Sequence, residues 1–392
     1  MNVIITPTYI DHFHFIKTYL RSFDKYVIDK LNTKQYFVIN KNEDNEFRKV
    51  IAGYDDIKIE VLYFEDLLEK NNVKFTPHQL FEKFDKFTYQ TLKKLYAILH
   101  IPEQECLIID SESMFINDTI VQELFEKNQL KKSIFFTKLN KRQATADFFY
   151  KLVKTHSNIL QTPDIWFLEH VNWFFEKRVI EDIVTHLGSP IDIAMNAYNI
   201  GLKNKECDIH LFEGLLYYGW IYKNKERYKD YQLCDIDDQL SLLLNERALL
   251  KYDRLFYKKF KGQAGRIEFA LSLLDNTNIK AFVELYRCNN IQILRCESST
   301  IQTYFYQKNL IDDLGIRILA CSQNHCFGLN SEKKIKKLVI NDVRIIKHWN
   351  NLNLTKYFFK AFANQLIEIV VILLLILKIP FNLFIYFIIR KF

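Results

Sequence analysis

The chain has 392 residues, a formal net charge of +7, 49% hydrophobic residues and 26% charged residues. This balance excludes an intrinsically disordered chain and leaves room for one large or two ordinary domains. Phe (33) and Tyr (22) are abundant whereas Gly (9) and Pro (6) are scarce, a bias that AT-rich coding sequences produce, so the aromatic content alone indicates no function.

Strands and helices are expected to alternate from the N-terminus. Apolar runs predict strands at 3–5 and 36–39, and apolar residues at 57, 59, 61, 63 and 64 predict a third. Helical spacing between residues 15 and 27 predicts a helix with Asp11 as its N-cap. A further helix is predicted over 87–99. This order predicts an α/β fold with a doubly wound sheet. Neither G-x-G-x-x-G nor G-x-x-x-x-G-K occurs, so a dinucleotide or P-loop site is unsupported.

The most informative stretch is the apolar run Cys106–Ile109, which is followed by Asp110, Ser111 and Glu112. Four apolar residues predict a strand buried on both faces, and ligands of open α/β sheets bind outside the carboxyl ends of such strands. The two acids lie two positions apart, so both can point to one side of an extended backbone and share a divalent cation. The alternative is a polar turn whose acids are solvated.

The segment after the acidic pair carries two further candidate groups. A helix is predicted at 118–127 and a strand at 134–136, followed by aromatic residues interleaved with polar ones between 166 and 182. Such a stripe suits sugar rings, although a stripe at this spacing is more often core. His170 and His186 lack an H-E-x-x-H context and are interpreted as structural. Glu213 is an acid within an apolar run, so it is either hydrogen-bonded or retained for chemistry.

The rest of the chain is dominated by its C-terminus. A helix over 240–250 and short strands at 291–294 and 316–319 are predicted, and the loop 262–266 matches no motif. A basic stretch then precedes the apolar segment 369–389, which Lys378 and Pro380 interrupt. We expect an in-plane or re-entrant anchor held against anionic lipid, with a single membrane span second and a buried core helix third.

Seven cysteines without a C-x-x-C pair favour reduced thiols in a cytoplasmic protein. The N-terminus has no apolar region long enough to predict a signal peptide.

Three short motifs, in this order, carry a family resemblance: Thr6–Pro7–Thr8–Tyr9, Gln90-x-x-x-Lys94-Leu95 and Leu107–Glu112. The chain resembles bacterial glycosyltransferases of the GT-A superfamily, in a family otherwise labelled only as a domain of unknown function and found in surface-polysaccharide loci. Residues 173–177 and 212–217 are similar to its later motifs. The resemblance covers residues 1–225 and implies a GT-A-like, Rossmann-type mixed sheet flanked by helices. A mainly helical extension is expected at 226–348, and the membrane-associating tail at 349–392.

The resemblance also implies roles for single residues around a nucleotide-sugar donor, with a UDP-sugar favoured. Those expected to contact the donor are Thr6, Thr8 and Tyr9 at the nucleobase, and Gln90, Lys94 and Ser111 at the diphosphate or sugar. Asp110 and Glu112 would hold Mn²⁺ or Mg²⁺, with Glu112 departing from the usual Asp. Glu213 would deprotonate the acceptor hydroxyl, with Asp110 also catalytic through the cation, and Trp173 and Glu176 would contact the acceptor.

The sequence therefore predicts a metal-dependent glycosyltransferase of the hexosyltransferase type. It would extend a lipid-linked or cell-surface glycan such as lipopolysaccharide at the cytoplasmic face of the inner membrane. A nucleotide-sugar hydrolase would use the same acids with water as the acceptor, and a non-catalytic assembly protein would keep the fold without the chemistry. Nucleic-acid binding is not expected, because the excess positive charge is concentrated beside the apolar tail.

Overall fold

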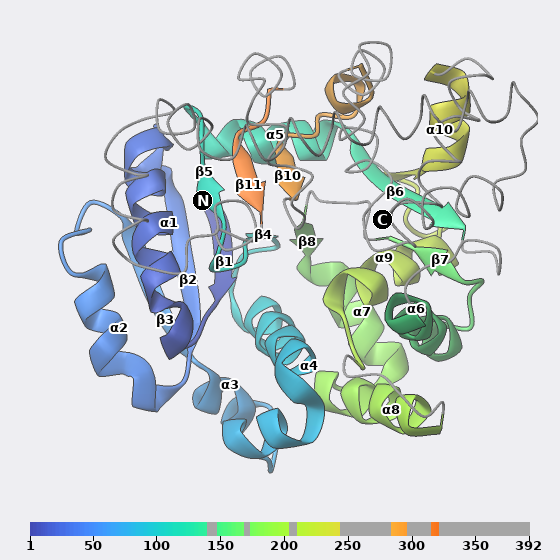
Figure 1. Ribbon diagram of the computed structural model, residues 1–392, viewed down its shortest axis with the longest axis horizontal. Coiled ribbons are helices and arrows are strands. Elements are labelled where there is room, and N and C mark those ends of the chain that lie inside the picture. The colour runs from blue at the N-terminus through green and yellow to red at the C-terminus, as the bar shows by residue number, and fades with distance from the viewer. Residues whose placement is uncertain (139–146, 168–172, 204–209, 244–283, 296–314, 321–392) are drawn as a thin grey trace, which may run out of the picture. The chain divides into compact units, whose positions relative to one another are not determined.

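The computed structural model describes residues 1–138, 147–167, 173–203, 210–243, 284–295 and 315–320 (Figure 1). Contacts divide the chain into two compact units, Met1–Val339 and Ile340–Phe392, and every described residue belongs to the first. None of the described helices is both long and apolar enough to cross a membrane. The predicted tail, the loop 262–266 and His170 lie outside the described residues, and the boundary at 225/226 stays a prediction.

A five-stranded sheet with the order β3-β2-β1-β4-β8 forms the centre of the first unit. Its parallel strands are β1 (Asn2–Pro7), β2 (Thr33–Ile39), β3 (Lys58–Tyr63) and β4 (Glu105–Ile108), and β8 (Phe174–Glu176) runs antiparallel beside β4. The inner strands β1 and β4 are buried nearly along their whole length, as expected where helices cover both faces of a sheet. The mixed α/β fold with a mostly parallel sheet confirms the predicted fold class.

The order of the strands creates a switch point between β1 and β4. The chain runs from β1 through α1 (Phe13–Tyr26) to β2, and through α2 (Asp44–Ile51) to β3. It then returns through α3 (Phe64–Lys70) and α4 (Pro77–His100) to β4, on the other side of β1 (Figure 1). Because such crossovers are right-handed, this reversal places α4 on the opposite face of the sheet from α1 and α2. The carboxyl ends of β1 and β4 therefore flank the crevice in which open α/β sheets bind ligands.

Two small sheets and the later helices complete the unit. The first small sheet has the order β7-β6-β9, with bounds Ile165–Trp166, Lys132–Lys138 and Tyr231–Asp235. The second has the order β10-β11-β5, with bounds Ile293–Arg295, Ile318–Ala320 and Met114–Phe115. The helices are α5 (Val121–Leu130), α6 (Asp147–Leu160), α7 (Lys177–Leu187), α8 (Pro190–Lys203), α9 (Glu213–Lys223) and α10 (Ile236–Leu243). Short strands thus occur near 291–294 and 316–319, as the sequence predicts.

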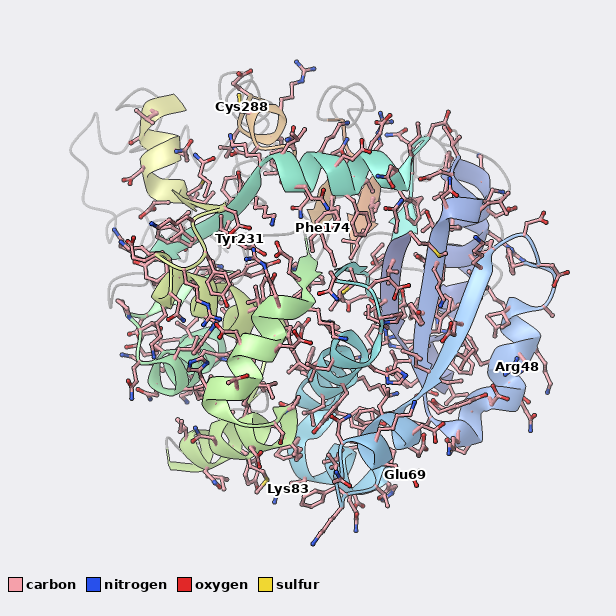
Figure 2. All side chains as sticks on the ribbon, turned by 180° about the vertical axis from the view of Figure 1, so that it is seen from behind. Arg48, Glu69, Lys83, Phe174, Tyr231 and Cys288 are labelled. Carbon is pink, nitrogen blue, oxygen red and sulfur yellow. The ribbon has the colours of Figure 1, made fainter. Side chains whose placement is uncertain are left out.

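The aromatic stripe after residue 166 belongs to the core. Trp173, Phe174 and Phe175 are buried, and the ring of Phe174 (labelled in Figure 2) packs edge-on against Phe125 of α5, with centroids 5.0 Å apart. The interpretation of these aromatics as core residues is confirmed. Phe174 and Phe175 lie in the antiparallel strand β8, directly after Trp173, rather than in a helix, because pairing with β4 supplies their backbone hydrogen bonds.

Two of the predicted helices begin later than the sequence suggests. A 3₁₀ turn, Ile10–His12, precedes α1, which begins at Phe13, so Asp11 lies within the turn and is not the N-cap. The helix predicted from residue 118 is α5, which begins at Val121. The carboxylate of Asp29 accepts hydrogen bonds from the N–H groups of Val121 and Gln122 at 2.8 and 2.9 Å. A cap supplied from so far along the chain leaves no local sequence pattern.

Candidate functional site

Helix α4 presents polar side chains to the interior at the switch point. It begins at Pro77 with Thr76 and Gln79 in a capping box, well before the predicted start at residue 87. Further along, Thr88, Thr91 and Lys94 are all buried. Their spacing of three places them along one face of the helix. Buried polar side chains need partners, and here the partners come from distant parts of the chain.

Lys94 is the centre of a buried cluster of charges. Its Nζ lies 2.5 Å from Oε1 of Glu213 and 3.0 Å from Oδ1 of Asp110. The side chains of Lys94 and Glu213 are only 5% and 3% exposed, whereas that of Asp110 is 29% exposed. Burial opposes the charged form of Lys94, but the carboxylates of Asp110 and Glu213 outweigh it and raise the pKa of Lys94 above its usual value. An ammonium group is therefore fixed beside the carboxyl end of β4.

Glu213 is held at the start of α9 by α4. The hydroxyl of Thr91 donates to Oε2 of Glu213 at 2.7 Å, so both carboxylate oxygens have partners. The N–H groups of His210 and Leu211, just before α9, both point to Oγ1 of Thr88, at 3.1 and 3.2 Å. As the first residue of α9, Glu213 also lies where the helix dipole favours a negative charge. Of the two alternatives that the sequence left open for this acid, the structure shows the hydrogen-bonded one, and the catalytic role stays a prediction.

A buried histidine, His156, is hydrogen-bonded to the residue before Glu213 and makes the stability of the fold depend on pH. Nε2 of His156 accepts from the N–H of Phe212 at 3.0 Å, and burial lowers the pKa of His156 to about 4. The unfolded chain therefore binds a proton between pH 6.5 and about 4 that the folded chain does not bind.

We expect the free energy of unfolding to fall by about 3 kcal/mol as the pH drops through this window, because the native imidazole stays neutral. Urea unfolding at several pH values measures how steeply the free energy of unfolding changes with pH. In His156→Gln, whose amide oxygen can accept the same hydrogen bond without titrating, the slope is expected to be correspondingly smaller. An unchanged slope in that variant would contradict the assignment to His156.

The turn after β4 places its three polar residues in different surroundings. The N–H of Ile109 donates to the carbonyl of Ile5 at 3.0 Å, which extends the pairing of β4 with β1 to the edge of the acidic pair. Ser111 is buried, and its Oγ lies 2.7 Å from Nδ1 of His12. Oε1 of Glu112 lies 3.6 Å from Nε2 of the same imidazole. Burial, with help from the charge of Lys86, lowers the pKa of His12 to about 3, so the ring is neutral at pH 7.

The end of β1 forms the other wall of this edge. Thr6 and Thr8 are buried, and the hydroxyl of Thr8 has no hydrogen-bond partner among the described residues. Nζ of the buried Lys93 donates to the carbonyl of Thr8 at 3.1 Å, and burial lowers the pKa of Lys93 to about 8. The ring of Tyr9 is half-buried and packs 4.2 Å from that of His12.

Most of the predicted site residues belong to elements that meet at this edge, but Glu176 does not lie there. Trp173 precedes β8, and its ring centre is 5.4 Å from Nζ of Lys94. Gln90, half-buried, is one turn before Lys94 on α4. Glu176 is paired in register with Glu105, at the opposite end of β4, and accepts from the hydroxyl of Tyr231 (labelled in Figure 2) at 2.8 Å.

Sequence reasoning missed four residues of the site: His12, Thr88, Thr91 and Lys93. The signal for Thr88 and Thr91 was present in the sequence, because hydroxyl residues recur with Lys94 at a spacing of three on a helix whose neighbouring positions are apolar. The role of His12 had no such signal, since it depends on the contact between the first turn and the segment after β4.

The residues at this edge fit a divalent cation. Asp110 and Glu112 supply carboxylate oxygens, and their side chains are 29% and 21% exposed. In the part of the chain that the structure describes, no group of three or more His, Cys, Asp or Glu residues is arranged to hold a metal. Mg²⁺ commonly uses only one or two carboxylates, with water and substrate phosphates as its other ligands. An acidic pair of this kind is therefore a suitable donor set for a cation that arrives with a phosphate.

Comparisons with known proteins find similar solved structures only. No protein-family model matches the chain, and no curated protein matches it. Membership of the family that the motifs resemble therefore stays a prediction.

Three solved glycosyltransferase structures are similar at 7–10% identity. Mouse xyloside xylosyltransferase 1 has a TM-score of 0.37, over 66% of this chain and 93% of that one. The galactosyltransferase LgtC, solved with donor and acceptor sugar analogues, has a TM-score of 0.36, over 86% of this chain and 95% of LgtC. The bifunctional glycosyltransferase WbbM has a TM-score of 0.37, over 89% of this chain but only 51% of its own. Similarity at this level does not establish a shared function, so the assignment has to rest on this protein's own side chains.

Proposed function

We propose that this protein is a glycosyltransferase that moves a sugar from a nucleotide-sugar donor, with a UDP-sugar favoured, to a glycan or lipid-linked acceptor. The observation that carries the proposal is the buried ammonium of Lys94, fixed between Asp110 and Glu213 at the switch point of the sheet. Glycosyl transfer leaves a diphosphate whose growing negative charge must be neutralised, and a preorganised cation in a water-poor site does this effectively. The acids beside Lys94 supply the remaining groups that the reaction needs.

The donor diphosphate would lie at the carboxyl ends of β1 and β4. Asp110 and Glu112 would hold Mn²⁺ or Mg²⁺, which would act as a Lewis acid on the phosphate oxygens. Lys94 would add a hydrogen-bonding positive charge from α4. The half-buried ring of Tyr9, beside Thr6 and Thr8, would border the nucleobase, with Gln90 and Ser111 toward the phosphates.

Lys94 also links donor binding to the acceptor side of the reaction. In the free protein its ammonium is bonded to Oε1 of Glu213. A diphosphate is a stronger anionic partner, so its arrival would draw the ammonium away from Glu213. The carboxylate of Glu213 would then be able to accept the proton of an acceptor hydroxyl, which is the role the resemblance implies. Trp173, whose ring centre is 5.4 Å from Nζ of Lys94, is buried, so it would position the ammonium rather than offer its ring face to the acceptor sugar.

The proposed location is the cytoplasmic face of the inner membrane, reached through the basic and apolar tail at 349–392. The support for this part of the proposal is the composition of the tail alone. Flotation of the full chain with anionic and with neutral vesicles tests it, and failure to float with either would contradict a membrane role.

Donor binding is the first test of the proposed activity. We expect one of UDP, GDP, CDP or their sugars to raise the melting temperature of the full chain in the presence of Mn²⁺, because a ligand bound to the folded state stabilises it by mass action. Asp110→Asn should abolish the metal-dependent part of this rise. As a matched control, Asp66→Asn removes an acid from a surface ion pair with Lys41 and should bind the donor normally.

Product analysis then separates the competing activities. Sugar transfer that depends on an added acceptor supports the proposal, whereas equally fast release of free sugar without an acceptor would identify a hydrolase. A well-folded chain that no nucleotide stabilises would contradict the proposal and favour a non-catalytic assembly protein.

A further inference from the structure

Lys86 is a cation of α4 to which the proposed function assigns no role. It lies one turn before Gln90 and two turns before Lys94, so the three side chains share one face of the helix. Its Nζ is 5.1 Å from the ring centre of Tyr9, which follows β1. Both Lys86 and Tyr9 are half-buried. The ammonium of Lys86 therefore lies at the edge of the sheet where β1 ends.

The charge of Lys86 also reaches the acidic turn after β4. Of the charged groups that act on the imidazole of His12, Lys86 has the largest effect. Nδ1 of that imidazole lies 2.7 Å from Oγ of Ser111, and its Nε2 lies 3.6 Å from Oε1 of Glu112. Since the interaction of two charges weakens with distance, an ammonium that acts on this ring also acts on an anion bound beside Glu112.

Lys86 differs from the other two lysines at this edge because no oxygen atom holds its ammonium. Lys94 is bonded to two carboxylates, and Lys93 donates to the carbonyl of Thr8. Within the part of the chain that the structure describes, Lys86 has no hydrogen bond or ion pair, and its ammonium lies over the ring of Tyr9. A cation–π contact at a partly exposed site is weak, so an anion can replace it readily.

A diphosphate that arrives at this edge needs such an uncommitted cation. The carboxylates of Asp110, Glu112 and Glu213 lie there and repel an anion. Lys94 is bonded to two of these carboxylates, so it has to give up an existing partner before it can bind a phosphate. Lys86 can bind an anion without first breaking an ion pair.

We propose that Lys86 binds one phosphate of the donor and makes the site selective for nucleoside diphosphates over nucleoside monophosphates. This role rests on the proposed function for the identity of the anion. Two turns of helix separate the Cα atoms of Lys86 and Lys94 by about 12 Å, so their long side chains can reach a diphosphate from both ends. A monophosphate can use only one of the two ammonium groups. Because Lys86 binds the phosphate directly, part of the affinity for the donor needs no metal.

The test is the binding of inorganic pyrophosphate to the full chain, measured by calorimetry at low salt in EDTA and then in Mn²⁺. Pyrophosphate has two phosphates but no base or sugar, so the result does not depend on which nucleotide is the donor. We expect wild type to bind pyrophosphate in EDTA, and orthophosphate at least about tenfold more weakly. Lys86→Met should weaken pyrophosphate binding about tenfold with and without metal, because one charge-assisted hydrogen bond is lost. Asp110→Asn should weaken it only in Mn²⁺.

Two variants control for net charge and for the shape of the side chain. Lys83→Met removes a lysine one turn earlier on the same helix, beside Tyr198, and should bind pyrophosphate as wild type does. Lys86→Arg keeps the positive charge and should bind within about threefold of wild type. Thermal melting without ligand establishes that each variant is folded.

The outcomes separate this role of Lys86 from the proposed function. Unchanged pyrophosphate binding in Lys86→Met would overturn it, and so would an equal loss in Lys83→Met, which would report net charge alone. Wild type that binds no pyrophosphate in EDTA, or binds orthophosphate equally well, would do the same. If a nucleotide sugar then still stabilised the chain, the glycosyltransferase proposal would stand without Lys86. If pyrophosphate bound through Lys86 but no nucleotide stabilised the chain, the anion site would stand and the donor assignment would fail.

Discussion

Lys94→Met is expected to abolish sugar transfer and to lower the free energy of unfolding by about 3–5 kcal/mol. The reason for the loss of stability is that Glu213, whose side chain is 3% exposed, would keep its charge without the ammonium that now lies 2.5 Å away. The reason for the loss of activity is that no other buried ammonium bridges these two carboxylates within the described part of the chain. Urea unfolding gives the first quantity, and a transfer assay at saturating donor gives the second.

Two variants separate the stability effect from the chemical one. Lys83→Met replaces a lysine of the same helix that is 5.1 Å from the ring centre of Tyr198 (Lys83 is labelled in Figure 2), and it should cost less than about 1 kcal/mol. Lys94→Met combined with Glu213→Leu removes the buried charge as well. It should recover much of the stability, because apolar replacement of a whole buried ion pair is often neutral. The double variant should nevertheless remain inactive. Recovery of transfer activity with stability would show that Lys94 serves the fold alone.

Glu213→Gln is expected to retain donor binding within about threefold but to reduce turnover by about 10²-fold or more. The amide keeps a hydrogen-bond acceptor for Lys94, so the ammonium stays in place. The amide cannot, however, take a proton from an acceptor hydroxyl. Thermal shift with the donor measures the first effect, and single-turnover kinetics with acceptor measure the second.

The comparison variant is Thr91→Val, which removes the hydroxyl that donates to Glu213 at 2.7 Å but keeps the carboxylate. It should lower stability by about 1–2 kcal/mol and leave turnover within about tenfold of wild type. Turnover close to wild type in Glu213→Gln would mean that the carboxylate only holds Lys94. Another group would then have to remove the proton.

The sequence determined the central sheet and one side of the site, because these features follow from local patterns. Apolar runs at 3–5, 36–39 and 106–109 mark the parallel strands β1, β2 and β4, and alternating apolar residues at 57–64 mark the half-exposed edge strand β3. Since a strand buried on both faces must be apolar along its length, such strands can be read from the sequence directly. The position of Asp110 and Glu112 at the carboxyl edge follows from the same pattern.

Only the tertiary structure decided which groups surround the acidic pair. Lys94 and Glu213 are 119 residues apart in the chain, and nothing in the periodicity around either residue indicates that they pair. His12 and Ser111 are 99 residues apart, and their contact depends on β1 and β4 being neighbours in the sheet. The family resemblance implied a place for Glu176 in the site, whereas antiparallel pairing of β8 places it at the other end of β4.

The physical reason for this division is the range of the interactions. Hydrophobic periodicity and turn chemistry act over a few residues and leave a signature in the sequence. A buried charge is tolerated only with a partner, but the partner's position in the chain is set by topology. The single acid in the apolar run 212–220 therefore indicates that Glu213 needs a partner. Which residues are the partners, Lys94 and Thr91, is decided by the packing of α4 against the start of α9.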